Sequence, residues 1–172
     1  MTIFTHCHSS IVNNILKQAK KQGKKFQVHV TETRPLFQGR ITATELSKAG
    51  IPVTIYVDSA ARLALKKSDL FLFGADAITS EGKVINKIGT EMFIEFADKY
   101  DISSYSCTDS WKYDPKTVFG IEEKIEKRAS REVWKNPPKN VKISNPAFEK
   151  VKPELITGII SELGIYLSLI HI

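Results

Sequence analysis

The sequence predicts an α/β fold, a doubly wound and mostly parallel sheet with helices on both faces. Short β-rich segments alternate with segments of helical periodicity, and the apolar run Leu70 to Phe73 is continuous, as in a strand at the centre of a sheet. The content of 42% hydrophobic and 26% charged residues is typical of folded globular proteins. Because 172 residues is the length of one domain, we expect a single domain over residues 1–172.

The first half of the chain predicts four strands and three helices. The first helix has an apolar stripe over Ile11 to Ala19 and ends at Gly23. Thr42 and Glu45 have the spacing of a capping box, so the second helix is expected to begin at Thr42 and to end at Gly50. The third helix is expected over Ser59 to Lys67. The expected strands are Thr2 to Thr5, Phe26 to Thr31, Val53 to Val57 and Leu70 to Phe73.

The second half predicts a hairpin, further helices and a fifth strand. Glu81-Gly82 predicts the turn of a hairpin within Ala77 to Ile85, and a fifth strand is expected over Ile102 to Cys107. A helix begins at Gly89-Thr90 with Met92, Phe93, Phe96 and Ala97 facing inward. We expect a helix and then a long surface crossing over residues 122–146, and a last helix over Glu154 to Glu162. The apolar tail after Gly164 is an edge strand, an oligomer contact or a chain-end artefact.

The net charge of +6 suggests an anionic partner. Five lysines fall within residues 17–25, either as a solvated helix end, where cations favour the helix dipole, or as a nucleic-acid contact. No aromatic residues interleave with these lysines to stack on bases, so we expect no direct nucleic-acid contact. A phosphorylated small molecule fits the charge as well as a polynucleotide does.

The chain has no apolar run of the roughly 18 residues that span a bilayer, and its first residues do not have the pattern of a secretory signal. Two cysteines, Cys7 and Cys107, fit a reduced compartment better than a disulfide framework. We therefore expect a cytoplasmic protein without a membrane contact.

Cys7 is a candidate reactive thiol, because it lies between the first strand and the first helix. The helix N-terminus there is expected to lower its pKa, and the alternative is a small buried side chain. His6 and His8 flank Cys7, but successive side chains of a strand point to opposite faces, so we expect no metal here.

Further polar residues follow the other strands, at the edge where open parallel sheets bind ligands. Asp76 follows the fourth strand as a turn cap or a general base. Asn86 and Lys87 precede a helix start, and Arg34 and the run Gln38-Gly39-Arg40 follow the second strand as anion-compatible donors. The sequence has neither a dinucleotide-type glycine fingerprint nor a P-loop, which disfavours nucleotide hydrolysis and a nicotinamide cofactor.

These motifs resemble, in order and spacing, one protein family over residues 3 to about 166. They are Thr5-His6-Cys7, Glu32-Thr33-Arg34-Pro35 with Gln38-Gly39, Gly74-Ala75-Asp76-Ala77-Ile78 with Asn86-Lys87-Ile88-Gly89-Thr90, and Asn145-Pro146-Ala147-Phe148. The family unites isomerases of ribose 1,5-bisphosphate and of methylthioribose 1-phosphate with the regulatory alpha, beta and delta subunits of translation initiation factor two B. Its domain of this kind is Rossmann-like.

The resemblance implies an aldose–ketose isomerase in which Cys7 and Asp76 are the catalytic pair. Arg34, Gln38, Gly39, Asn86 and Lys87 would bind the phosphorylated sugar, with neither metal nor cofactor. The joint presence of the cysteine and the aspartate favours the isomerases, and the Gln38 to Thr42 run resembles the ribose 1,5-bisphosphate branch. The alternatives are a non-catalytic regulatory subunit that binds initiation factor two, and an inactive remnant.

Members of this family usually carry a helical N-terminal domain, which this sequence lacks, so we expect a fragment, a truncated product or a chain that pairs with a separate partner. Relatives pair through the present domain, and an apolar patch left uncovered favours association. We therefore expect at least a homodimer with Ile156, Ile159 and Ile160 of the last helix, Leu167 and Ile170 near the contact. Core packing of these isoleucines is the alternative.

Overall fold

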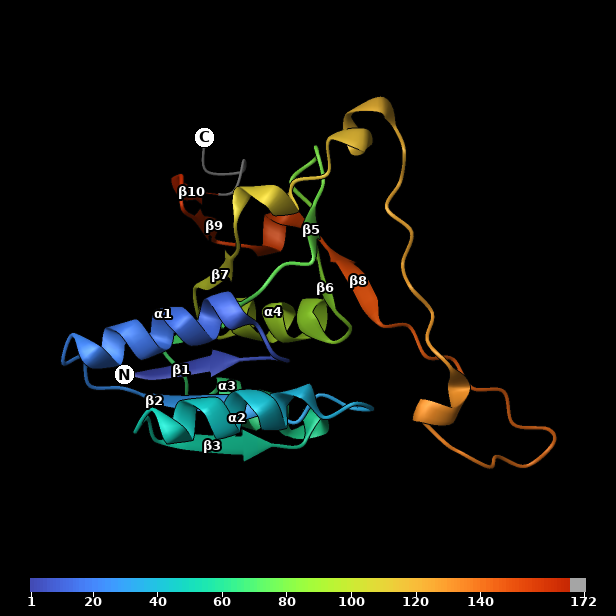
Figure 1. Cartoon of the computed structure of the whole chain (residues 1–172), viewed down its shortest axis with the longest axis horizontal. Helices are drawn as coiled ribbons and strands as arrows, with labels where there is room; N and C mark the ends of the chain where they lie inside the picture. Colours follow the sequence, from blue (N-terminus) through green and yellow to red (C-terminus); the bar gives the residue numbers. More distant parts are fainter. Residues whose placement is uncertain (168–172) are drawn as a thin grey trace.

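A seven-stranded sheet forms the centre of the structure, a computed structural model that describes residues 1–167 (Figure 1). The strand order is β10-β9-β7-β4-β1-β2-β3, and every neighbouring pair is parallel except β9 and β10. This sheet confirms the predicted mostly parallel α/β fold. Its strands are β1 (Thr2–Thr5), β2 (Gln27–Thr31), β3 (Val53–Tyr56), β4 (Leu70–Phe73), β7 (Ser104–Cys107), β9 (Gly158–Ser161) and β10 (Gly164–Leu167).

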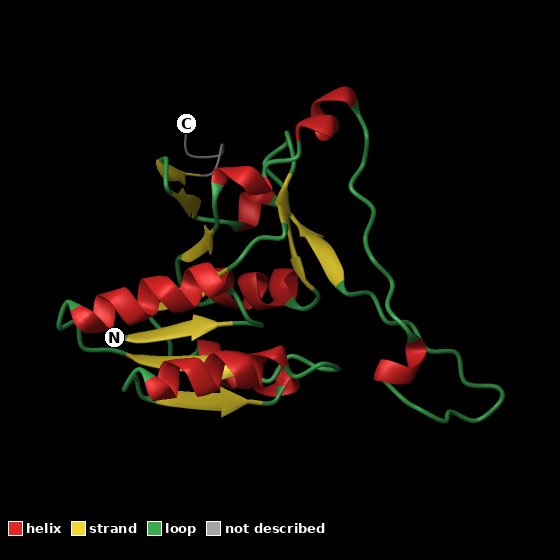
Figure 2. Ribbon diagram, viewed as in Figure 1, coloured by secondary structure: helices red, strands yellow, loops and turns green. Residues whose placement is uncertain are grey.

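Helices cover the sheet on both faces (Figure 2). Side chains alternate along each strand, so Ile3 and Leu72 pack under α1 and α2 whereas Phe4 and Phe71 pack under α3 and α4. Met92 of α4 is 46% exposed, contrary to the prediction that it faces inward, and Ile94 is buried there instead. The helices are α1 (Ser10–Lys21), α2 (Gln38–Lys48), α3 (Ala61–Leu65) and α4 (Thr90–Lys99).

The second helix begins earlier than the capping box predicted. Phe37 is its N-cap in a left-handed conformation, and the helix is already formed at Gln38. Thr42 is buried within the helix, where its hydroxyl donates to the Cys7 carbonyl oxygen at 2.8 Å. The Thr42 and Glu45 side chains thus make tertiary contacts instead of capping.

A second, three-stranded antiparallel sheet is formed by strands that lie between those of the central sheet in the chain. It consists of β5 (Ala77–Ile78), β6 (Val84–Lys87) and β8 (Phe148–Val151). The turn between β5 and β6 includes Gly82, whose φ is +75°, which confirms the predicted hairpin. Strand β6 carries Asn86 and Lys87 and leads directly into the turn before α4.

Residues 108–147 form an arm that extends away from the central sheet (Figure 1). The helix expected at the start of residues 122–146 is absent there, and the arm holds only the short 3₁₀ turns Ser110–Lys112, Pro115–Phe119 and Ser130–Glu132. The physical reason is that Ile125 is the sole apolar residue between Glu122 and Arg128, so a helix would have no apolar face to bury.

The last predicted helix is also wrong. A 3₁₀ turn, Pro153–Leu155, leads into strands β9 and β10. The β-branched pair Ile159 and Ile160 favours a strand, and β7 and β10 supply its backbone partners. The tail therefore continues as an edge strand to Leu167, while Ile170 lies outside the described residues.

Within residues 1–167, none of the helices combines the length and the apolar character needed to cross a membrane.

Candidate active site

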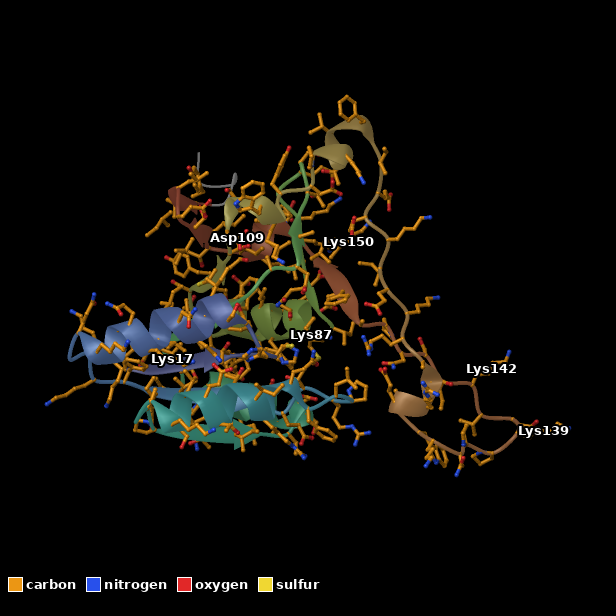
Figure 3. All side chains as sticks on the ribbon, viewed as in Figure 1. Lys17, Lys87, Asp109, Lys139, Lys142 and Lys150 are labelled. Atoms are coloured by element: carbon orange, nitrogen blue, oxygen red, sulfur yellow. The ribbon has the colours of Figure 1, made fainter. Side chains whose placement is uncertain are left out.

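The predicted site residues come from loops at the carboxyl edge of the parallel sheet and from the neighbouring β6. Cys7 follows β1, Arg34 to Gly39 follow β2, and Asp76 follows β4. Lys87 ends β6, where Figure 3 labels it beside α4. Four segments that are distant in the sequence therefore contribute to one region. The neighbouring strands β4, β1 and β2 bring three of them together. The fourth, β6, belongs to the other sheet, and the Lys87 charge at its end acts on both Cys7 and Asp76.

Cys7 is held in an unusual backbone conformation by two threonine side chains. Its φ is +66°, which is rare for a residue other than glycine. Its amide donates to Thr33 Oγ1 at 3.0 Å, and its carbonyl oxygen accepts from Thr42 Oγ1 at 2.8 Å. The loop after β2 and helix α2 thus hold the backbone of Cys7 in place.

The Cys7 thiol is protonated at neutral pH. Burial raises its pKa to about 11, and the His8 amide and the Lys87 charge only partly oppose this rise. The predicted lowering by a helix N-terminus is wrong, because α1 begins at Ser10 with Ser9 as its cap, and desolvation dominates. Cys7 can therefore donate a proton, whereas a role as a thiolate nucleophile at neutral pH is disfavoured.

Lys87 provides a buried positive charge. Its side chain is 7% exposed, and its Nζ lies 4.6 Å from the centre of the Phe148 ring, a cation–π contact. Among the described residues no carboxylate forms an ion pair with it. A buried ammonium group whose protein partner is an aromatic ring is well suited to an anionic ligand.

Asn86 is oriented by the start of α4. Its side-chain amide donates to Thr90 Oγ1 at 3.0 Å, and the Thr90 hydroxyl donates to the Lys87 carbonyl oxygen at 2.6 Å. The same contacts fix the backbone of Lys87. Asn86 thus supports Lys87 through Thr90, and this contact uses one of the two N–H donors of its side-chain amide.

Asp76 is exposed at the rim of the site, beyond the end of β4. Its amide donates to the Ile85 carbonyl oxygen at 2.7 Å, which ties the loop to β6. Desolvation raises the pKa of its carboxyl, while the charges of Lys112 and Lys87 lower it. The Asp76 charge in turn raises the pKa of Cys7, and the Lys87 charge acts on both groups, so the three share one electrostatic environment.

The segment after β2 contributes a tightly packed turn. Gly39 lies so close to β2 that an added Cβ would be 1.7 Å from the Thr31 carbonyl oxygen. Gln38 is half-buried beside it. The Arg34 amide donates to Asp58 at 2.6 Å, whereas the Arg34 side chain is exposed. The sequence placed these residues at the correct edge, and the structure assigns a packing role to Gly39.

Two residues at the site were missed as participants. The sequence suggests His6 only as a candidate metal ligand. Its buried ring instead bonds to Thr31 Oγ1 at 2.5 Å through Nδ1 and to the Ile88 carbonyl oxygen at 3.1 Å through Nε2. Lys112 lies in the arm and is the strongest opposing charge on Asp76. Alternation along β1 could have indicated that His6 points into the fold, but the sequence has no signal that brings Lys112 near Asp76.

His6 links the loop of Cys7 to the loop of Lys87. A carbonyl oxygen only accepts hydrogen bonds, so Nε2 carries the proton and Nδ1 accepts from Thr31. Burial lowers the pKa of His6 to about 4, so the ring is neutral near pH 7. The Phe93 ring packs edge-on against it at 4.8 Å between centroids. His6 is therefore a positioning residue between the two loops.

Comparisons with known proteins identify the family of this chain. The model of the family described as the initiation factor 2 subunit family matches residues 1–168. The chain belongs to this family. A ribose 1,5-bisphosphate isomerase of Thermococcus kodakarensis is 45% identical over 168 residues, which cover 95% of this chain and 52% of that protein.

Other similar proteins carry different names. A methylthioribose-1-phosphate isomerase of Fervidobacterium nodosum is 38% identical, over 95% of this chain and 51% of that protein. A crystal structure described as translation initiation factor eIF-2B of Pyrococcus horikoshii superimposes with a TM-score of 0.87 at 31% identity, covering 99% of this chain and 60% of that one. The chain thus spans about half the length of the curated relatives it matches.

Proposed function

We propose that this chain is part of a sugar-phosphate isomerase that converts ribose 1,5-bisphosphate to ribulose 1,5-bisphosphate. The observation that carries the proposal is the grouping of a protonated thiol, a carboxylate and a buried ammonium group, Cys7, Asp76 and Lys87, at one sheet edge. Archaeal relatives at 40–45% identity over 95% of this chain bear the corresponding name.

The proposed chemistry assigns one task to each group. An acid is needed to help open the sugar ring, and the protonated Cys7 supplies it. Hydrogen must then move between the first two carbons, and Asp76 is the carboxylate partner in this step. Lys87, with Asn86, stabilises charge on the substrate oxygens, and Arg34, Gln38 and Gly39 line the same region.

The primary test is conversion of ribose 1,5-bisphosphate by the chain and by Cys7→Ser. Removal of a general acid should lower turnover by about 10²-fold or more. Equal activity of the two proteins would show that Cys7 has no catalytic role.

A second test does not depend on turnover. Ribose 1,5-bisphosphate should slow alkylation of the Cys7 thiol, and Lys87→Met should abolish this protection, because the buried cation is lost. Unphosphorylated ribose is the matched control ligand, and equal protection by ribose and by the bisphosphate would contradict a phosphate-binding role for Lys87.

A regulatory subunit of translation initiation factor two B is the second candidate. It is favoured by solved structures described as eIF-2B from Pyrococcus horikoshii and Archaeoglobus fulgidus, both 31% identical with TM-scores of 0.87. Association with initiation factor two in a pull-down, together with absence of isomerase activity, would support this candidate. Activity without association would eliminate it.

We also propose that the chain forms at least a homodimer. Ile156 is 3% exposed and packs in the core, so the alternative of core packing holds for this residue. Ile159 and Ile160 are half-buried on β9. The exposed apolar surface lies instead on β10, which includes Leu167, and on the arm, where Trp111 and Phe119 are 92% and 81% exposed.

A further inference from the structure

Three loops at the amino edge of the central sheet, together with the last helical turns before them, gather lysines that are far apart in the sequence. These loops join α1 to β2, α2 to β3 and α3 to β4, and they lie side by side because β4, β1, β2 and β3 are neighbouring parallel strands. In Figure 3 the Lys17 label lies toward this end of α1, and Lys87 marks the opposite side of the sheet. The lysines are Lys20, Lys21, Lys24, Lys25, Lys48, Lys66 and Lys67, which we call the basic edge.

The basic edge accounts for the whole charge surplus of the protein. Asp69 is the acidic residue within these loops, and its carboxylate accepts a hydrogen bond from the Thr2 amide at 2.7 Å. The chain has 25 basic and 19 acidic side chains, so setting aside the seven lysines and Asp69 leaves 18 of each. The remainder of the molecule is therefore balanced in net charge. Asp98, Lys99 and Asp101, at the end of α4 and in the loop before β7, lie at the same edge of the sheet and together carry one net negative charge, so the edge stays strongly positive.

The basic edge is fully available to a ligand. All seven lysines are exposed, and none of them forms an ion pair with a described residue. A hollow of about 430 Å³ lies between the ends of α1 and α2, lined in part by Lys20 and Lys21. Favourable contact with helix dipoles accounts for lysines in a last helical turn, such as Lys21 and Lys48, but not for Lys24, Lys25 and Lys67, which follow the helices.

We propose that the basic edge binds the phosphate backbone of a double-stranded nucleic acid. This inference reverses the expectation from sequence, which considered the five lysines of residues 17–25 without those of the other two loops. The lack of interleaved aromatic residues argues against stacking on exposed bases, and a double helix presents its phosphates outward with its bases paired. Recognition is therefore electrostatic and independent of base sequence.

A lipid surface fits the basic edge less well. Membrane-surface segments combine cations with an apolar face that enters the headgroup region. Within the three loops the described residues include no exposed large hydrophobic side chain, since Ile51 is buried and Phe26 is half-buried. Met1, which is 64% exposed at the same edge, is a single apolar side chain and does not form an apolar face. The basic edge lies at the amino edge of the central sheet, whereas the proposed site for the sugar substrate lies at its carboxyl edge. Either proposal can therefore fail without the other.

The test is binding of a fluorescent 20-base-pair DNA duplex to the chain, followed by anisotropy across a salt series. We expect a dissociation constant on the order of 10–100 μM at low salt, as in non-specific binding. Each contacted phosphate contributes about −0.9 to the slope of the logarithm of the association constant against the logarithm of the salt concentration. Three contacts therefore give a slope of about −3. Absence of binding at low salt would overturn the proposal.

Two variants with the same charge change locate the contact. Replacement of Lys24, Lys25 and Lys67 by Glu removes three of the seven lysines of the basic edge, and replacement of Lys135, Lys139 and Lys142 by Glu alters exposed lysines of the arm. Both changes bring the net charge from +6 to zero. We expect at least a tenfold loss of affinity and a shallower salt slope for the first variant, and less than a twofold change for the second. Equal losses would contradict the basic edge as the binding surface.

Further controls distinguish a loss of binding from a loss of folding, and binding to nucleic acid from binding to other polyanions. The triple Lys→Gln variant at positions 24, 25 and 67 introduces no acidic side chains near the helix ends, so it tests the edge if the Glu variant unfolds. Vesicles with phosphatidylserine and polyglutamate serve as other polyanions. Binding of either one as tightly as the duplex, with the same loss in the edge variant, would rule out nucleic acid as the preferred partner.

Discussion

Burial shifts the pKa values of two adjacent residues of the site in opposite directions: it lowers that of His6 and raises that of Cys7. It disfavours the charged form of each, so the thiol keeps its proton and the imidazole remains without its second proton. The site near neutral pH therefore contains a neutral acid and a neutral positioning ring. The buried charge of Lys87 lowers the pKa of both His6 and Cys7. Lys87 has no ion-pair partner among the described residues.

The ionisation of Cys7 can be measured from its alkylation rate. In a Cys107→Ala background the rate with iodoacetamide should be slow at pH 7.5 and should rise with a midpoint near pH 11. The thiolate fraction at pH 7.5 is then about one in three thousand. A midpoint below the ordinary value of 9 would show that burial does not dominate.

Folding stability should fall at high pH because of the same thiol. A raised pKa in the folded state means that the contribution is fully present below pH 9 and is lost as the pH rises toward 11. Urea unfolding of the Cys107→Ala protein and of the double variant with Cys7→Ala should therefore differ in pH dependence over this window. Parallel curves would contradict the assignment.

His6 should make stability depend on pH at the acid side. Its folded pKa of about 4 lies below the ordinary value of 6.5, so the unfolded chain binds more protons between these values and stability is lost as pH falls through this range. The loss is on the order of 3 kcal/mol at most. In His6→Gln, which retains an N–H donor for Ile88 but cannot titrate, this component should disappear in urea unfolding at pH 4 to 7. An unchanged pH dependence would contradict the assignment.

Helix α2 depends on a glycine for its position against β2. Gly→Ala inside a helix normally stabilises by about 0.5–1 kcal/mol, but at Gly39 the added Cβ would meet the Thr31 carbonyl oxygen at 1.7 Å. We therefore expect Gly39→Ala to lower the free energy of unfolding by about 2 kcal/mol or more. Ser47→Ala, at an exposed position of the same helix, is the control and should be nearly neutral. A stabilised Gly39→Ala protein would show that α2 can shift freely.

The elements that were predicted correctly have strong local signals. Leu70 to Phe73 is a continuous apolar run, and α1 has an apolar stripe that ends before a glycine. Thr42 and Glu45 misled the prediction because a capping box and a pair of tertiary contacts have the same sequence spacing. Ile156, Ile159 and Ile160 have helical spacing as well, but pairing with β7 and β10 decided for a strand.

The molecule as a whole exposes apolar side chains on its arm and on β10, which predicts self-association. Light scattering over a dilution series should show a species of twice the chain mass. Replacement of Trp111 and Phe119 by Glu should shift it toward the monomer, whereas Leu63→Glu, at an exposed residue of α3, should not. A monomer at every concentration would contradict the homodimer.

The sequence by itself determined the α/β class and the edge at which the site lies. Alternating strands and helices favour parallel strands, whose carboxyl ends meet at one edge, so Cys7, Arg34 and Asp76 were expected at that edge. The strand order β4-β1-β2, which the tertiary structure shows, makes them neighbours there. Protonation of Cys7 and His6 was decided by the tertiary structure, because desolvation depends on everything that packs around a group. The tertiary structure also decided the strand pairing of β9 and the assembly of the basic edge, since both join segments whose separation in the sequence carries no local signal.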